Sequence, residues 1–191
     1  MKNQHILCLE KVLNPLTVDS SYISLIKSKT TIQCKLKIIQ EIKDPLEEFQ
    51  KDFKKLRGKK TEEILKNLSH ILGYGLGSTP ESDDLFLGIL AVNYCLNGDV
   101  CNEFALLASF PFEKFTTSES AQLIRKFLTQ NFPPELVPFL RLLKGQLKDD
   151  QGKIRFELEV RKIRSLGTSS GYYFLLGVLW GLKYNIKRIS L

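Results

Sequence analysis

The most informative stretch of this chain lies between residues 73 and 84 and reads Gly73-Tyr74-Gly75-Leu76-Gly77-Ser78-Thr79-Pro80-Glu81-Ser82-Asp83-Asp84. Its three glycines allow positive φ angles, and a residue before proline avoids the α region. We therefore expect a tight loop over residues 73–79, with Thr79 as the N-cap and Pro80 as the first residue of a helix. Such a loop presents backbone amides and a positive helix end, which together favour anions. No lysine follows as in a Walker loop, and the spacing is not the dinucleotide-binding pattern.

Two adjacent carboxylates follow this loop, at Asp83 and Asp84. In the first turn of a helix the macrodipole is expected to lower their pKa values and keep both groups ionised. Ionised carboxylates suit binding of a metal ion such as Mg²⁺, or acceptance of an N–H donor. We take both as candidate catalytic and metal-binding residues, although adjacent helical positions point about 100° apart, so one is expected to enter the site. The alternative is that both only cap the helix.

A second run of small residues, Gly167-Thr168-Ser169-Ser170-Gly171, precedes another apolar helix. The helices after the two loops share a pattern, with Gly88 in Asp84-Leu-Phe-Leu-Gly-Ile-Leu and Gly177 in Tyr173-Phe-Leu-Leu-Gly-Val-Leu. Because glycine inside a helix costs about 1 kcal/mol relative to alanine, it usually indicates a close backbone approach. We expect the two helices to cross at these glycines, which would bring both loops to one pocket. Chance similarity of two apolar helices is the alternative.

The composition is that of a globular protein. The 191 residues are 43% hydrophobic and 26% charged, which suits a single domain over residues 1–191 and argues against a disordered chain. We expect an α+β fold, in which short N-terminal β-strands in a β-rich part (1–44) pack on a mainly helical part (45–191) that carries both loop–helix elements.

One expected strand is the short apolar run His5–Leu9. The others are Thr31–Ile42 and residues 153–160, where apolar and polar residues alternate. Residues 153–164 remain open between a strand and a helix. Helices are expected at 45–58, 61–72, 80–97, 100–109, 117–130, 134–147 and 171–184.

The net charge of +7 is unevenly distributed along the chain. Residues 61–120 contain two lysines and nine acidic residues, and this acidic third holds the glycine-rich loop. A nucleic-acid-binding protein would be expected to place basic side chains around that loop, so we expect no nucleic-acid partner. No apolar stretch reaches the roughly 20 residues of a membrane span, and the four cysteines form no CxxC pair. We expect a cytoplasmic protein with reduced thiols and no membrane contact.

The loop motif resembles the Gly-Leu-Gly-Pro-Gly-Leu-Thr-Pro-Ser-Gly-Asp-Asp-Phe-Leu-Ala-Gly signature of a bacterial domain family. That family includes the AllH-type third subunit of oxamate carbamoyltransferase in anaerobic allantoin breakdown. The residues that carry the resemblance are Gly73, Gly75, Gly77, Thr79, Pro80, Asp83, Asp84 and Gly88, followed by Thr116 and Thr117 before a helix and by 167–171 with Gly177.

The resemblance implies a subunit of a carbamoyl- or acyl-transferring assembly in nitrogen or purine catabolism, with partner transferase subunits. Its ligand would be a small anion, carbamoyl phosphate or an oxamate-like molecule. The implied ligand-binding residues are Gly73, Gly75, Gly77, Ser78, Thr79, Thr116, Thr117, Gly167, Thr168, Ser169, Ser170 and Gly171.

The chain departs from the family signature at several positions. Leu76 replaces its proline, Glu81-Ser82 replace its Ser-Gly, and Thr168 and Tyr173 replace a histidine and an aspartate of the second motif. Losing two titratable groups removes capacity for proton transfer. The alternative function is therefore a non-catalytic ligand-binding or protein-interaction module without the family's chemistry.

Overall fold

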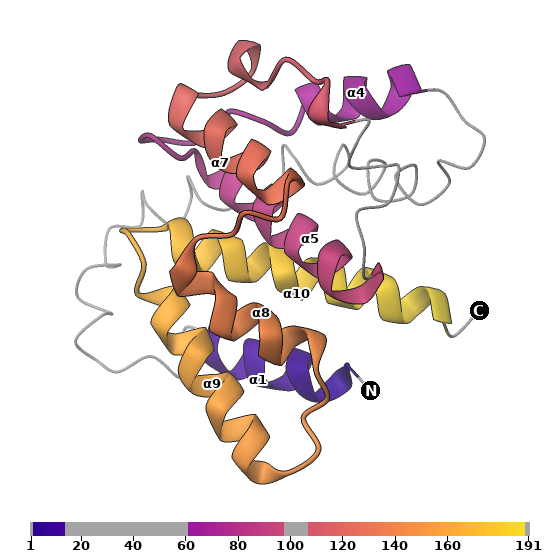
Figure 1. The fold of residues 1–191 in the computed structure, drawn as a ribbon, viewed down its shortest axis with the longest axis vertical. Helices are drawn as coiled ribbons and strands as arrows, with labels where there is room; N and C mark the ends of the chain where they lie inside the picture. The colour runs from indigo at the N-terminus through magenta and orange to yellow at the C-terminus, as the bar shows by residue number, and fades with distance from the viewer. Residues whose placement is uncertain (1, 14–60, 98–106, 190–191) are drawn as a thin grey trace, which may run out of the picture. The chain divides into compact units, whose positions relative to one another are not determined.

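The computed structural model describes residues 2–13, 61–97 and 107–189 (Figure 1). The elements of these ranges are helical. They are α1 (Asn3–Leu13), α4 (Thr61–Ser69), α5 (Glu81–Asn97), the 3₁₀ turns η2 (Phe112–Lys114) and η3 (Pro134–Leu136), α7 (Ser118–Leu128), α8 (Val137–Lys144), α9 (Asp150–Arg164) and α10 (Ser170–Ile189). In these ranges, no helix is both long and apolar enough for a membrane crossing.

The expectation of an α+β fold with N-terminal strands was wrong for the described residues. The segment His5–Leu9, expected as a strand, lies inside α1, whose buried residues are His5, Leu9, Val12 and Leu13. This spacing of four, three and one residues places them on one helical face. The apolar run alone was too short to show that period. The expected strand Thr31–Ile42 and the expected helix 45–58 lie outside the described residues, as does most of 100–109.

The strand expected over residues 153–160 was also wrong, because this segment forms part of α9. Asp149 caps the helix, accepting a hydrogen bond from the Gly152 N–H at 2.7 Å. Phe156 and Val160 are buried, whereas Leu158, which alternation would place on the same face, is 53% exposed. Buried residues four positions apart are typical of a helix. The sequence was compatible with a strand or a helix, and packing against other helices determines which one forms.

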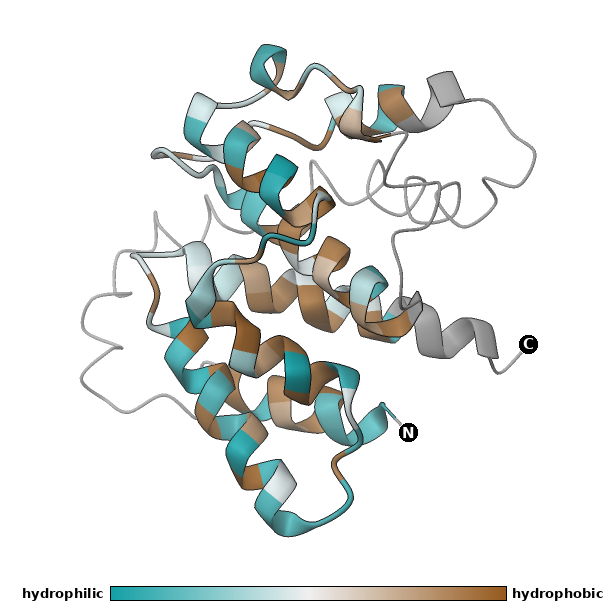
Figure 2. Cartoon of the chain, viewed as in Figure 1, coloured by the Kyte–Doolittle hydropathy of each residue, from teal (hydrophilic) through white to brown (hydrophobic). Residues whose placement is uncertain are grey.

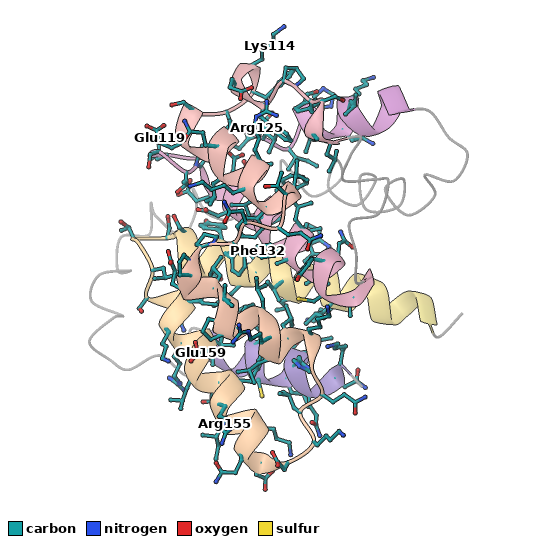
Figure 3. The ribbon with its side chains drawn as sticks, viewed as in Figure 1. Lys114, Glu119, Arg125, Phe132, Arg155 and Glu159 are labelled. Atoms are coloured by element: carbon teal, nitrogen blue, oxygen red, sulfur yellow. The ribbon has the colours of Figure 1, made fainter. Side chains whose placement is uncertain are left out.

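Charged side chains along α9 also favour the helix. Lys153 pairs with Asp150, Arg161 with Glu157 and Lys162 with Glu159, each three or four residues apart. Such pairs stabilise a helix slightly and would not meet along one strand. Figure 3 shows Arg155 and Glu159 among the polar side chains that α9 carries.

Alanine substitutions on α9 distinguish its two faces. We expect Val160→Ala to lower the free energy of unfolding by about 2 kcal/mol, because it leaves a cavity in the core. Leu158→Ala should change it by less than about 0.5 kcal/mol, since that side chain is mostly solvated. Urea unfolding of the two variants measures both values, and equal losses would contradict the burial of one face only.

The chain divides into two compact units. Unit 1 comprises Met1–Asp19, Asp84–Asp99 and Gln130–Leu191, and unit 2 comprises Ser20–Asp83 and Val100–Thr129. In unit 1, α1 packs on α9 and α10, and α9 also packs on α8 and α10. Figure 2 shows the hydrophobic residues along α10. Phe139 and Phe156 stack in this core with ring centroids 5.4 Å apart.

The expected crossing of two helices at Gly88 and Gly177 is confirmed within unit 1. A Cβ atom on Gly88 would lie under 3.0 Å from the backbone of Phe174 and Val178, and one on Gly177 would lie equally close to the backbone of Leu85. The backbones of α5 and α10 therefore touch, and no side chain fits at either position.

Unit 2 contains α4, the first residues of α5, η2 and α7. Its described core includes Leu68, Ile71, Phe112 and Ile124. Arg125 of α7 joins these elements: its guanidinium donates to Glu113 and to the carbonyls of Ala108 and Phe110, and lies over the Phe112 ring. Figure 3 labels this arginine together with Lys114. The helices expected at 61–72 and 117–130 are confirmed here with slightly shorter bounds.

Candidate functional site

The glycine-rich loop lies between α4 and α5, as expected. Gly73, Gly75 and Gly77 have φ angles of +83°, +131° and +89°. Side chains with a Cβ rarely adopt these values, so the loop requires glycine at all three positions. The helix begins at Glu81, one residue later than expected.

The carboxylate of Asp83 is fully buried behind this loop. Its Oδ1 accepts the Gly73 N–H at 2.8 Å and the Ser82 hydroxyl at 3.3 Å. Its Oδ2 accepts the Ser120 hydroxyl at 2.6 Å and also the Thr116 hydroxyl. Each oxygen therefore accepts hydrogen bonds from two protein donors. These four donors come from the loop, from α5 and from the start of α7.

Burial raises the pKa of Asp83, against the opposing effect of its hydrogen bonds to Ser120, Thr116, Gly73 and Ser82. The expectation that a helix N-terminus lowers this pKa was wrong, because it did not include the desolvation of the carboxylate. A metal ion or substrate donor could bind Asp83 only by displacing one of four internal donors. Asp84 is also buried, being 4% exposed. Among the described residues, no group of three or more His, Cys, Asp or Glu side chains could hold a metal ion.

The first turn of α5 also holds the first half of the loop. Ser82 and Tyr74 exchange two hydrogen bonds: the Tyr74 N–H donates to the Ser82 hydroxyl at 2.9 Å, and the Ser82 N–H to the Tyr74 carbonyl at 3.0 Å. The Glu81 carboxylate accepts the Leu76 N–H at 2.8 Å and fills the space beside Gly75. Three loop amides, including that of Gly73, are therefore already bound to side chains of the chain itself.

The start of α7 contacts the loop in unit 2. Thr117 is the N-cap of α7, and its hydroxyl accepts the Ser120 N–H at 3.2 Å and donates to the Ser78 carbonyl. Gly73 packs so closely on the Phe115 carbonyl that a Cβ atom would lie under 3.0 Å from it. The structure thus brings the expected residues Thr116 and Thr117 together with the loop.

Sequence reasoning missed Ser82, Glu81 and Ser120 as parts of this arrangement. The first two lie between the cap and Asp83, where a side chain can fold back on the loop. Ser120 follows Thr117 by three residues, which is the spacing of a capping box, but nothing in that spacing indicates its bond to Asp83.

The second half of the loop is open. Gly77 and Ser78 are exposed, and nothing lies within 4 Å of a Cβ atom built on Gly77. Thr79 is half-buried. An external ligand could therefore approach the loop at Gly77 and Ser78, whereas the side of Gly75 is filled by Glu81.

The second loop belongs to unit 1, between α9 and α10. Gly167 has a φ of +61°, and Thr168 is exposed. Gly171 is buried against the Ile163 carbonyl, where a Cβ atom would lie under 3.0 Å away. Gly171 therefore has a packing role, while Ser169 and Ser170 are half-buried residues at the start of α10. The pocket expected from both loops stays a prediction.

One known family matches the part of the chain that contains both loops. The profile of the family described as oxamate carbamoyltransferase subunit AllH matches residues 71–182, which span both loops and more than half of the chain. No curated protein and no solved structure matches the chain significantly. The family match includes the Asp83 network, the crossing of α5 and α10, and the start of α7, and the chain therefore belongs to the AllH family.

Proposed function

We propose that this chain is a subunit of a carbamoyl- or acyl-transferring assembly in nitrogen or purine catabolism, such as allantoin breakdown. In this proposal it binds a small anion, carbamoyl phosphate or an oxamate-like molecule, at the glycine-rich loop. Membership of a family described as a transferase subunit supports the assembly and the need for partner subunits.

The open half of the loop is the observation that carries the ligand proposal. Gly77 and Ser78 are exposed, and Ser78 accepts from Thr117, the N-cap of α7. The loop also leads directly into α5. An anion at Gly77 and Ser78 would therefore lie near the positive ends of two helices, which favour negative charge.

The internal carboxylates restrict where that anion can lie. Glu81 already accepts the Leu76 N–H, so a second anion there would meet like charge. The anionic end of the ligand is therefore assigned to Gly77, Ser78 and Thr79. Ligand contacts from Thr168, Ser169 and Ser170, and Mg²⁺ at Asp83 or Asp84, remain predictions.

A second candidate function is a non-catalytic binding or interaction module. It is favoured by Asp83, whose two oxygens each accept two internal donors. A buried carboxylate in that state braces the loop and leaves no lone pair directed to a substrate. In this candidate, catalysis belongs to partner subunits.

Titration of the purified chain with carbamoyl phosphate and with oxamate, with and without Mg²⁺, tests the ligand proposal. We expect heat of binding for at least one of them in the wild type. Ser78→Asp should weaken that binding by about tenfold or more, because it places a like charge at the open half of the loop.

Asn131→Asp is the matched control, since it adds the same charge at an exposed position outside the loop. Binding that Ser78→Asp leaves unchanged would place the ligand elsewhere, and a wild type that binds neither anion would favour the interaction module. Anion binding that requires Mg²⁺ would support Asp83 or Asp84 as a metal ligand.

A further inference from the structure

The start of α1 caps the end of α8 in unit 1. Gly145 ends α8, and the carbonyls of the last helical turn need donors from elsewhere. The ammonium of Lys2 donates to the carbonyls of Leu143, Lys144 and Gly145. The imidazole Nε2 of His5 lies 3.1 Å from the preceding carbonyl, that of Leu142. His5 of α1 and Lys2, which precedes this helix, thus satisfy four consecutive carbonyls about 140 residues away in the sequence.

The imidazole of His5 is fully buried in this contact. Its ring meets the Phe156 ring edge-on, with centroids 4.9 Å apart. Because a carbonyl can only accept, Nε2 must carry the hydrogen and Nδ1 is the acceptor nitrogen of the neutral ring. Nδ1 is buried and has no hydrogen-bond partner among the described residues.

A second proton on His5 would be poorly accommodated here. It would place an N–H with no acceptor among the described residues, and a positive charge near the ammonium of Lys2. The carboxylates of the neighbouring elements are already paired: Glu157 of α9 with Lys11 and Arg161, and Glu10 of α1 with Lys183 of α10.

Other charged groups on the elements around His5 do not offset the charge of a protonated imidazole. Lys153 of α9, which is close to Cys8, pairs with Asp150, and Lys144 of α8 lies over the Tyr94 ring of α5. The buried thiol of Cys95 on α5 stays protonated, because burial raises its pKa to about 12.

We infer that His5 makes the docking of α1 acid-sensitive: α1 stays on α8, α9 and α10 while the imidazole is neutral and is released when it becomes protonated. Burial lowers the pKa of His5 from 6.5 to about 4 in the docked state. The released helix exposes the ring and restores its ordinary pKa. Lowering the pH from about 6.5 to 4 therefore favours the released state, which binds the proton more tightly.

Amide hydrogen exchange of α1 between pH 4 and pH 7, corrected for intrinsic exchange, measures this release. We expect the opening equilibrium of α1 to rise about 100-fold from pH 7 to pH 4, as two pKa values of 6.5 and about 4 imply. His5→Gln should remove most of the rise, since its amide can still donate to the Leu142 carbonyl but does not titrate in this range. His70→Gln, which changes the other histidine of the chain, should keep it.

Three results would overturn the inference. One is an unchanged pH dependence in His5→Gln, and another is α1 protection that does not fall by pH 4. The third is simultaneous loss of protection in α8, α9 and α10, which would mean global unfolding of unit 1. If His5→Gln does not fold, the imidazole Hε1 signal that persists in His70→Gln gives the pKa directly. A value near 6.5 while α1 stays protected would then exclude the mechanism.

Discussion

Replacing Asp83 by alanine should lower the free energy of unfolding by about 4 kcal/mol. The substitution leaves the Gly73 N–H and the hydroxyls of Thr116 and Ser120 without their acceptor inside unit 2. Removing one partner from a buried charged network costs about 3–5 kcal/mol, because the remaining donors stay desolvated. Urea unfolding followed by far-UV circular dichroism measures the loss.

Asp150→Ala is the control, because this carboxylate is exposed and pairs with Lys153 within α9. We expect it to leave the stability close to that of the wild type. A similar small effect of Asp83→Ala would mean that the carboxylate does not brace the loop. The Gly73 amide provides a local measurement, since its hydrogen exchange should accelerate in Asp83→Ala only.

Asp83→Asn separates the charge of Asp83 from its shape. An amide can still accept from Gly73, while its NH₂ group faces hydroxyls that can rotate to accept. The pKa of Asp83 is raised in the folded state, so the folded state binds a proton more tightly than the unfolded chain. The stability contributed by this group therefore falls as the pH rises from about 4 through the raised pKa. We expect wild type to be more stable than Asp83→Asn at low pH, and this difference in the free energy of unfolding to decrease as the pH rises over the same range.

The parts of the fold that the sequence predicted depend on local signals. Glycines and Pro80 indicate the loop and the start of α5, and Thr117 caps α7, because such residues act on the backbone within a few residues. The wrong predictions concern α1 and α9. The cap at Asp149 is a local signal for α9, but the strand prediction rested on the alternation of apolar residues instead. On α9 every second residue from Ile154 to Val160 is apolar, and only contacts with other helices of unit 1 decide which of them are buried. The close approach at Gly88 and Gly177 was predictable, because glycine inside a helix is destabilising and usually has a packing role.

In the candidate site, too, the local features were predictable from the sequence and the tertiary contacts were not. The sequence predicted the glycine-rich loop before α5, and it singled out Asp83 and Thr117 as candidate residues. It did not predict that Asp83 would be buried, because its partners Thr116 and Ser120 lie more than 30 residues away. Hydroxyl residues are common, and no spacing rule connects them to a carboxylate at that distance. The pKa expectation failed for the same reason, since desolvation is a tertiary property.

The crossing of α5 and α10 gives the other large expected effect. Helix propensity alone predicts that Gly88→Ala and Gly177→Ala each stabilise the chain by about 1 kcal/mol. Packing predicts the opposite, because each new Cβ atom would lie under 3.0 Å from backbone atoms of the other helix. Backbone atoms cannot move aside as a flexible side chain can, so the helices must separate. We expect each variant to lose at least about 3 kcal/mol, at the upper end of the cost of overpacking.

Gly145→Ala is the matched control, because its Cβ atom would meet nothing closer than 3.5 Å. This variant should be about as stable as the wild type. The double variant of Gly88 and Gly177 should lose less than the sum of the single losses, since both Cβ atoms push apart the same pair of helices and the first already opens the gap for the second. Strictly additive losses would mean that the two glycines relieve separate contacts. Single variants as stable as the wild type would show that propensity outweighs packing and that α5 and α10 do not touch at these positions.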